Sequence, residues 1–313
     1  MFLLILGIGG DLGGQEATKE PPALPDFDSL WNFEDPAETE GKFRDLLPMI
    51  AGSGNLSAHA QLLTQIARAE GLQNRFEDAH QTLDAVESIL TKDLVLAKVR
   101  YLLERGRVYN SSKEVEKSKP FFLEAWDLAR SAGEDYYAVD AAHMMGIVEP
   151  PEKQLEWAEK SMDLAEHSSK PKAKEWLGPL YNNTGWSYHD LGQYDKALEL
   201  FEKSLKWREE RKDEGGTLIA RWTIGRAYRS LGRIEEALEI QKRLESEGRA
   251  GTFEWDGYVY EEIAECLLLL HREEESRPYF RRAHEIHVND LWLVVEEPKR
   301  LERLKELGAG GAP

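Results

Sequence analysis

The sequence predicts an all-helical solenoid of about six helical hairpins. One pattern of small and aromatic residues recurs along the chain, and it is best preserved from Gly178 and again from Leu218. Charged residues make up 31% of the chain and hydrophobic residues 41%, which is normal for a helical protein with much solvent-facing surface. A recurring pattern of this length is typical of units that bury their apolar faces only by stacking on their neighbours.

The small residues of the pattern predict where helices cross. We place the units at Ala60, Val99, Asp135, Gly178, Leu218 and Gly257. The eighth position is then Gly or Ala in every unit, as Ala67, Gly106, Ala142, Gly185, Gly225 and Ala264. The twentieth position holds Ala79, Ser118, Gln154, Ala197, Ala237 and Ser276, with Gln154 the one large residue. We expect the two helices of a hairpin to cross at these positions, because larger side chains would hold the backbones apart.

This pattern resembles the tetratricopeptide repeat over about residues 60–287. The resemblance implies a right-handed solenoid that binds partners and carries no catalytic chemistry. The units lie near 40 residues apart in the C-terminal half, longer than the 34 of the standard repeat. That spacing is similar to the long-helix subclass that includes the kinesin light chain. Glu70, Arg105, Thr184 and Arg221 stand where the repeat usually has an apolar or aromatic residue, so we expect local repacking there.

Helices are also predicted to cap both ends of the solenoid, because end units need a polar cover. Asp35, Pro36 and Glu38 provide an N-cap, a proline at the first helical position and an acid two residues later, which predicts a helix over 36–47. An amphipathic helix from Pro298 is expected to end before Gly308.

The predicted organisation is a flexible acidic segment (1–35), a cap helix and connection (36–58), the solenoid (59–290), and a cap helix with tail (291–313). The prolines are expected in turns between helices.

The first residues allow three interpretations. The apolar run 1–6 precedes Gly7, Gly9 and Gly10, but a secretory signal would need a basic start. A dinucleotide-binding loop would need a glycine where Leu12 stands. We favour an unstructured start followed by a linker over 15–25, and therefore a cytoplasmic protein, with export as the alternative.

Charge and cysteine content exclude several classes of site. The formal net charge of −18 disfavours binding to nucleic acid or to membrane surfaces, and no run is long enough to span a bilayer. The single Cys266 excludes an internal disulfide and multi-cysteine metal sites, and its place in a first helix indicates a core residue.

The resemblance implies that the first helix of each unit lines a concave groove. Arginines on this face suit carboxylates, paired asparagines suit an extended peptide backbone, and tryptophans suit an apolar anchor. The same face carries Gln65 and Arg100. The predicted peptide-binding residues are Arg68, Arg107, Asn110, His143, Asn182, Asn183, Trp186, His189, Trp222, Arg226 and Arg229. The alternative is that the arginines only balance acids such as Glu104 and Asp140 on the same face.

The segment 26–35 has the chemistry that this groove would accept, since it is acidic and contains Phe27, Trp31 and Phe33. A flexible linker would give it a high effective concentration, so one interpretation is that it folds back and occupies the groove until a partner displaces it. The alternative is that Trp31 and Phe33 pack only on the cap helix as a hydrophobic staple.

Enzymatic interpretations lack companion residues. His284 and His287 share a helical face but would need a third metal ligand. Asp140 with His143 has no nucleophile, and the pair at 189–190 lacks further metal ligands. We therefore expect no catalytic residue, cofactor or metal. The sequence predicts a non-catalytic protein-binding scaffold that recognises an extended acidic peptide. The alternative is a scaffold that oligomerises through its convex face or its ends.

Overall fold

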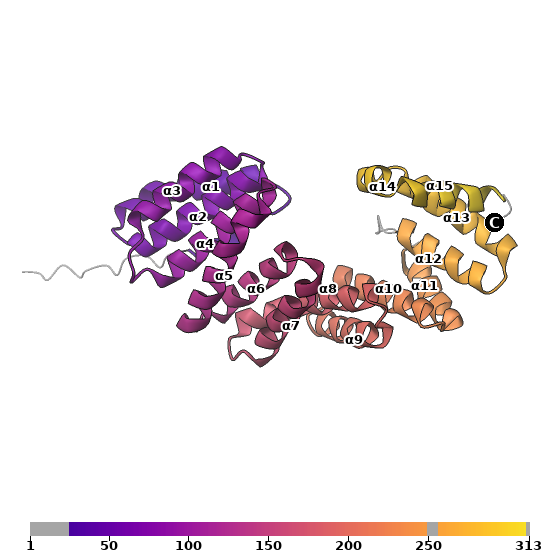
Figure 1. Cartoon of the computed structure of the whole chain (residues 1–313). Coiled ribbons are helices and arrows are strands. Elements are labelled where there is room, and N and C mark those ends of the chain that lie inside the picture. The colour runs from indigo at the N-terminus through magenta and orange to yellow at the C-terminus, as the bar shows by residue number, and fades with distance from the viewer. Residues whose placement is uncertain (1–24, 249–255, 311–313) are drawn as a thin grey trace, which may run out of the picture.

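The computed structural model describes residues 25–248 and 256–310, and these residues form helices without a strand. Figure 1 shows the helices following one another along a curved path, with the first and last hairpins at its two ends. The predicted all-helical solenoid of hairpins is confirmed. The apolar start and the linker predicted before residue 25, like the last three residues of the predicted tail, lie outside the described residues.

Six hairpins make up the solenoid within the described ranges. They are α2 (Leu56–Leu72) with α3 (Phe76–Ile89), α4 (Val95–Ser111) with α5 (Val115–Ala132), α6 (Asp135–Val148) with α7 (Pro151–His167), α8 (Leu177–Asp190) with α9 (Tyr194–Glu210), α10 (Glu214–Ser230) with α11 (Ile234–Gly248), and α12 (Asp256–Leu269) with α13 (Glu273–His287). Their first helices begin 37–42 residues apart. The flanking elements are η1 (Phe27–Leu30), α1 (Pro36–Gly52), η2 (Pro171–Trp176) between α7 and α8, α14 (Leu291–Glu296) and α15 (Pro298–Ala309).

Close helix crossing explains the small residues of the repeat. The predicted residues at the eighth position of each unit are all buried. A Cβ atom on Gly106 would lie 2.5 Å from Cε1 of Phe122, and one on Gly185 would lie 2.5 Å from Cε1 of Phe201. Both phenyl rings are fully buried and fill the space beside the crossing. Glycine is therefore required at these two crossings, because a Cβ atom would overlap the facing phenyl ring.

The third hairpin departs from this arrangement. Gln154 stands at its twentieth position and is half-buried, and its Nε2 donates to the backbone oxygen of Glu149 at 2.9 Å. The close approach lies instead at Gly146, where a Cβ atom would be 3.5 Å from the backbone oxygen of Gln154. The third unit therefore forms a hairpin like the others, but its two helices approach each other at Gly146.

Charged residues at apolar repeat positions form links between helices. Glu70 is 2% exposed and accepts a hydrogen bond from Nη2 of Arg44 on α1 at 2.6 Å. Arg105 is 5% exposed and donates to Oδ1 of Asp84 on α3 at 2.5 Å. The expected repacking is here an ion pair to a neighbouring helix. It satisfies only one oxygen of Glu70, because Oε2 is buried without a hydrogen-bond partner among the described residues.

The N-terminal cap helix begins as predicted but ends later. The side chain of Asp35 accepts from the backbone N–H of Glu38 at 2.9 Å, and Pro36 is the first helical residue. α1 then runs to Gly52, past the predicted end at residue 47. The expectation that prolines lie in turns is wrong for Pro48, Pro120 and Pro278, which lie inside helices. All three are exposed, so water can hydrate the carbonyl that loses its helical partner.

The C-terminal cap also extends beyond its predicted end. α15 continues through Gly308, which lies so close to α13 that a Cβ atom there would be 2.8 Å from the backbone nitrogen of Arg281. The helix ends at Gly310, whose φ of +83° is left-handed. The short helix α14 precedes α15 and was not predicted. None of the helices in the described part of the chain is both long and apolar enough to cross a membrane.

We expect Gly185→Ala to lower the free energy of unfolding by about 1–3 kcal/mol, because overpacking against Phe201 outweighs the better helix propensity of alanine. The control is Gly41→Ala on α1, where nothing lies within 4 Å of the added Cβ atom. That change should be neutral or stabilise by up to about 1 kcal/mol. Urea unfolding followed by far-UV circular dichroism measures both. Equal stability of the two variants would contradict the proposed role of the crossing.

Candidate peptide-binding groove

The first helices of successive hairpins form one surface, which we call the concave face. In Figure 1, α6 and α8 lie on the inner side of the curve, whereas α7 and α9 lie on its outer side. This arrangement follows from the repeat, since each first helix packs against the preceding second helix and leaves its other side open.

Residues 26–33 of the chain, which we call the N-terminal segment, lie against the beginning of this face. Asp28 accepts from Nη2 of Arg100 on α4 and from Nζ of Lys172 on η2, each at 2.6 Å. Burial disfavours the Asp28 carboxylate, but Arg100 and Lys172 outweigh burial and lower its pKa below the ordinary value. The carboxylate is therefore ionised at neutral pH, and it joins the second hairpin to the connection before the fourth.

The aromatic residues of this segment contact both the groove and the cap helix. Nε1 of Trp31 donates to Oε1 of Gln65 on α2 at 2.8 Å. The Trp31 ring stacks on Phe33 at 4.9 Å and meets Phe43 of α1 edge-on at 5.4 Å. The guanidinium of Arg68 lies 5.5 Å and 5.4 Å from the Trp31 and Phe33 ring centres. The segment thus makes the groove contacts expected for folding back as well as the contacts expected for a staple.

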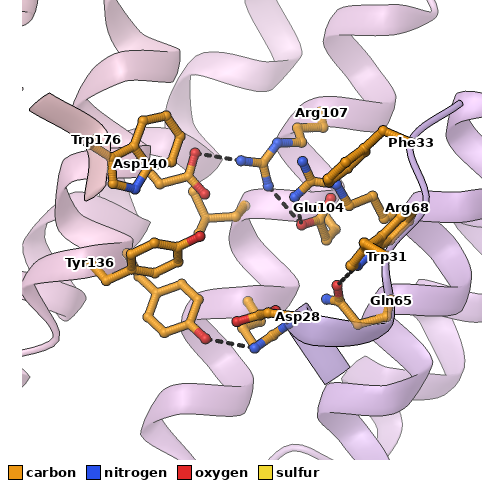
Figure 2. A pocket seen from close by; sticks show the side chains of 13 residues that line it. Asp28, Trp31, Phe33, Gln65, Arg68, Glu104, Arg107, Tyr136, Asp140 and Trp176 are labelled. Atoms are coloured by element: carbon orange, nitrogen blue, oxygen red, sulfur yellow. Dashed lines mark hydrogen bonds and ion pairs between the residues drawn. The ribbon is translucent and has the colours of Figure 1, made fainter. Parts of the chain in front are cut away.

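A cavity of about 230 Å³ remains beside this segment. Figure 2 shows Trp31 and Phe33 on one side of it and Tyr136, Asp140 and Trp176 on the other. Nε1 of Trp176 is buried there and has no hydrogen-bond partner among the described residues. The cavity is therefore bounded by aromatic rings and by charged groups.

Most of the predicted arginines are already paired with acids of the same face. Arg107 donates to Glu104 at 2.7 Å and to Asp140 at 2.5 Å, and Arg68 donates to Glu104 at 3.3 Å. In the fifth hairpin, Arg226 lies 3.2 Å from Glu262. Arg229 makes two hydrogen bonds with that same carboxylate, at 2.7 and 2.8 Å. The contacts of these four arginines are those expected if the arginines balance acids of the same face.

Arg100 differs from them. Its side chain is 6% exposed, and its ion pair is with Asp28, which lies outside the hairpins. No carboxylate of the described hairpins lies within ion-pair distance of it. Its Nη1 donates to the hydroxyl of Tyr137 at 2.6 Å. Arg100 therefore depends on the N-terminal segment for its ion pair, although Glu104 on the same helix also favours its charge.

The C-terminal half of the concave face carries a row of aromatic rings. The ring centres of Trp186 and Trp222 lie 5.9 Å apart, and those of Trp222 and Tyr258 lie 6.0 Å apart. Nε1 of Trp222 donates to the backbone oxygen of Tyr258 at 3.3 Å. These three residues, which we call the aromatic row, come from α8, α10 and α12. All three remain part-exposed.

The two predicted asparagines lie beside this row. Nδ2 of Asn182 donates to Oδ1 of Asn183 at 3.2 Å, and Asn183 is exposed. Oδ1 of Asn182 is buried and has no hydrogen-bond partner within residues 25–248 and 256–310. The pair therefore retains hydrogen-bonding capacity that the fold itself does not use.

The remaining predicted residues differ in accessibility. His189 is buried, with Nε2 2.9 Å from the hydroxyl of Ser230, and burial lowers its pKa. His143 packs its ring 5.4 Å from Trp176, and burial lowers its pKa as well. Both imidazoles are therefore biased toward the neutral form. Asn110 is part-exposed and lines a second recess with Arg107 and Met144.

Sequence reasoning did not include Arg100, Gln65, Tyr137, Lys172 or Trp176 among the candidate residues. Arg100 and Gln65 occupy groove positions of their units, so the repeat register contains a signal for them. Lys172 and Trp176 belong to η2, which lies in a connection between hairpins. A register based on repeat positions cannot place such residues.

His287, one of the two histidines considered for metal binding at 284 and 287, has other contacts. Nε2 of His287 lies 3.1 Å from Oε2 of Glu261, which also accepts from Nη2 of Arg300 at 2.8 Å. The described chain holds no group of three or more potential metal ligands. Cys266 is fully buried, and burial raises its pKa to about 12, which agrees with its predicted place in the core.

Comparisons with known proteins agree with this architecture. The family model described as tetratricopeptide repeat matches residues 176–245. The outer dynein arm-docking complex subunit 4 of Danio rerio is 30% identical over 163 residues, which are 51% of this chain and 30% of that protein. The match therefore covers less than a third of the length of that relative.

Solved structures share the fold at low sequence identity. The apo form of RapI has a TM-score of 0.70 at 13% identity, covering 90% of this chain and 77% of that one. A signal transduction ATPase with a tetratricopeptide repeat sensor from Pyrococcus horikoshii has a TM-score of 0.68 at 16% identity, covering 88% and 42%. Together with the family match over residues 176–245, these structures show that the chain has the fold of a tetratricopeptide repeat solenoid.

Proposed function

We propose that this chain is a non-catalytic protein-binding scaffold whose concave groove recognises an extended acidic peptide with an aromatic anchor. One observation carries the proposal. The N-terminal segment, which is itself acidic and aromatic, lies in the groove through an ion pair, an indole hydrogen bond and contacts between a guanidinium and two rings. These are the interactions that such a peptide would make.

The C-terminal half of the groove supports the same function. The aromatic row offers part-exposed ring surface for an anchor side chain, and aromatic residues are common at the centres of protein interfaces. Asn182 and Asn183 can pair with the N–H and C=O groups of an extended backbone. The relative from Danio rerio is named as a subunit of a docking complex, which is compatible with a role in assembly.

The groove is tested by affinity capture from a lysate of the source cells with the double variant Asn182→Ala and Asn183→Ala. Alanine favours the helix, so the fold should be kept while the amides are lost. We expect the captured partner to bind about tenfold more weakly, which corresponds to about 1.4 kcal/mol. The matched control is Gln81→Ala, which removes an exposed amide from α3 on the other side of the hairpin. Equal capture by the wild type and both variants would contradict binding in the groove.

A second candidate function is self-association through the C-terminal end. The short helix α14 exposes 80% of Leu291, 57% of Trp292 and 69% of Val295, whereas Leu293 points inward and is buried. Neighbouring apolar side chains with this exposure mark interaction surfaces. Under this alternative, a second copy of the chain covers α14.

Light scattering after size exclusion, over a range of protein concentrations, tests self-association. If α14 is the interface, the double variant Leu291→Ser and Trp292→Ser should lower the dimer fraction at every concentration. The control Leu191→Ser removes a leucine that is 60% exposed near the end of α8, and it should leave the dimer fraction unchanged. A wild-type chain that stays monomeric throughout would rule out this function.

A further inference from the structure

We infer that Gln65, Arg68, Arg100, Tyr137 and Lys172 form a receptor site for a partner segment in which an aspartate precedes a tryptophan by three residues and a phenylalanine follows by two. The N-terminal segment occupies this receptor site within the same chain. The inference rests on the proposed function and goes beyond it, because it names the ligand motif and the residues that select it.

The charge balance of the groove places the carboxylate-binding position at Arg100. The arginines of the predicted row are neutralised by Glu104, Asp140 and Glu262, so an incoming carboxylate would have to displace an existing partner. Arg100 has Asp28 alone as its ion-pair partner in the described chain. A buried guanidinium that loses its carboxylate is strongly destabilised. The site therefore requires a carboxylate from outside the hairpins.

Lys172 makes the site selective for a full negative charge. Arg100 and Lys172 together contribute two positive charges around the single carboxylate of Asp28. The hydroxyl of Tyr137 accepts a second hydrogen bond from Arg100. An asparagine in place of the aspartate would keep the shape but lose both ion pairs, and its NH2 group could not accept a hydrogen bond from the second cation.

The local conformation of the segment sets the spacing of the motif. η1 is a 3-10 helix, in which residues three apart lie on one side. Asp28 and Trp31 can therefore reach α4 and α2 together. The side chain of Asp26 accepts from the backbone N–H of Asp28 at 3.1 Å and so caps this turn. Phe33 then stacks on Trp31, and Arg68 lies over both rings.

Occupation within the chain regulates the site. The segment is joined directly to α1 at Asp35, so its effective concentration is on the order of millimolar. A partner segment therefore binds only if it competes successfully with the tethered N-terminal segment. The cavity of about 230 Å³ beside Trp31, lined also by Tyr136 and Trp176, gives it room for contacts that the chain's own segment does not make. A partner that fills this cavity can displace the segment.

The test uses a fluorescent peptide with the sequence of residues 25–34 and the full-length chain carrying Asp28→Asn. We expect this variant to bind the peptide at least about tenfold more tightly than the wild type, because its own segment competes less well. The control Glu34→Gln removes one negative charge from the same stretch, at an exposed residue. It should bind like the wild type. A peptide with asparagine at the position of Asp28 should bind the variant at least about tenfold more weakly.

Hydrogen exchange provides a second measurement. Exchange of the amides of residues 26–33 should rise in the Asp28→Asn chain and stay unchanged in the Glu34→Gln chain. Adding Lys172→Gln to the Asp28→Asn chain should weaken peptide binding. If all chains bind the peptide equally or not at all, with unchanged circular dichroism and unchanged exchange, the receptor site is rejected.

The groove function and the receptor site can be rejected independently of each other. If the Asn182 and Asn183 variant loses the captured partner but the peptide does not bind, the receptor site is rejected and the groove function stands. If the peptide binds as expected but capture is insensitive to that variant, the receptor site stands and recognition of the partner by Asn182 and Asn183 is rejected.

Discussion

The structure depends on the close crossing of two helices within each hairpin. At Gly106 and Gly185 the distance to the facing phenylalanine leaves no room for a Cβ atom, and the phenyl rings beside the crossings are fully buried. This contact fixes how each second helix lies against its first helix. Because each hairpin then presents an apolar face to the next, the crossing also sets the curve of the whole chain and the existence of a concave side.

Most arginines on the concave side form ion pairs with acids of the same side. Ion pairs such as Arg107 with Asp140 and Arg229 with Glu262 connect first helices of neighbouring hairpins. Such pairs hold the relative positions of successive units, and they make most of the predicted arginine row unavailable to a carboxylate from a partner. The cations of the proposed receptor site, Arg100 and Lys172, form their ion pairs with Asp28 of the N-terminal segment instead of with an acid of the hairpins. The acidic net charge of −18 is thus compatible with an acid-selective site.

The two ends of the solenoid differ in how they are covered. α1 covers the first hairpin with Phe43 and Ile50, which are fully buried, and the N-terminal segment adds Trp31 to the same cluster. At the other end α15 buries Leu304, but α14 leaves several apolar side chains exposed. A chain of stacked units always has two such ends, and the exposed one is where contact with another molecule removes the most apolar surface from water.

The sequence by itself determined the fold class, the number and approximate start of the hairpins, and the N-cap at Asp35, because these depend on local spacing and on small residues at fixed positions. It also indicated that residues 26–35 have the chemistry of a groove ligand. Tertiary structure alone decided which acid each arginine pairs with, since pairs such as Arg68 with Glu104 join residues far apart in sequence. It also decided that Lys172 and Trp176 face the groove, because they lie in a connection between hairpins that has no repeat position. Electrostatic pairing and loop placement depend on distances in space, which a repeat pattern does not contain.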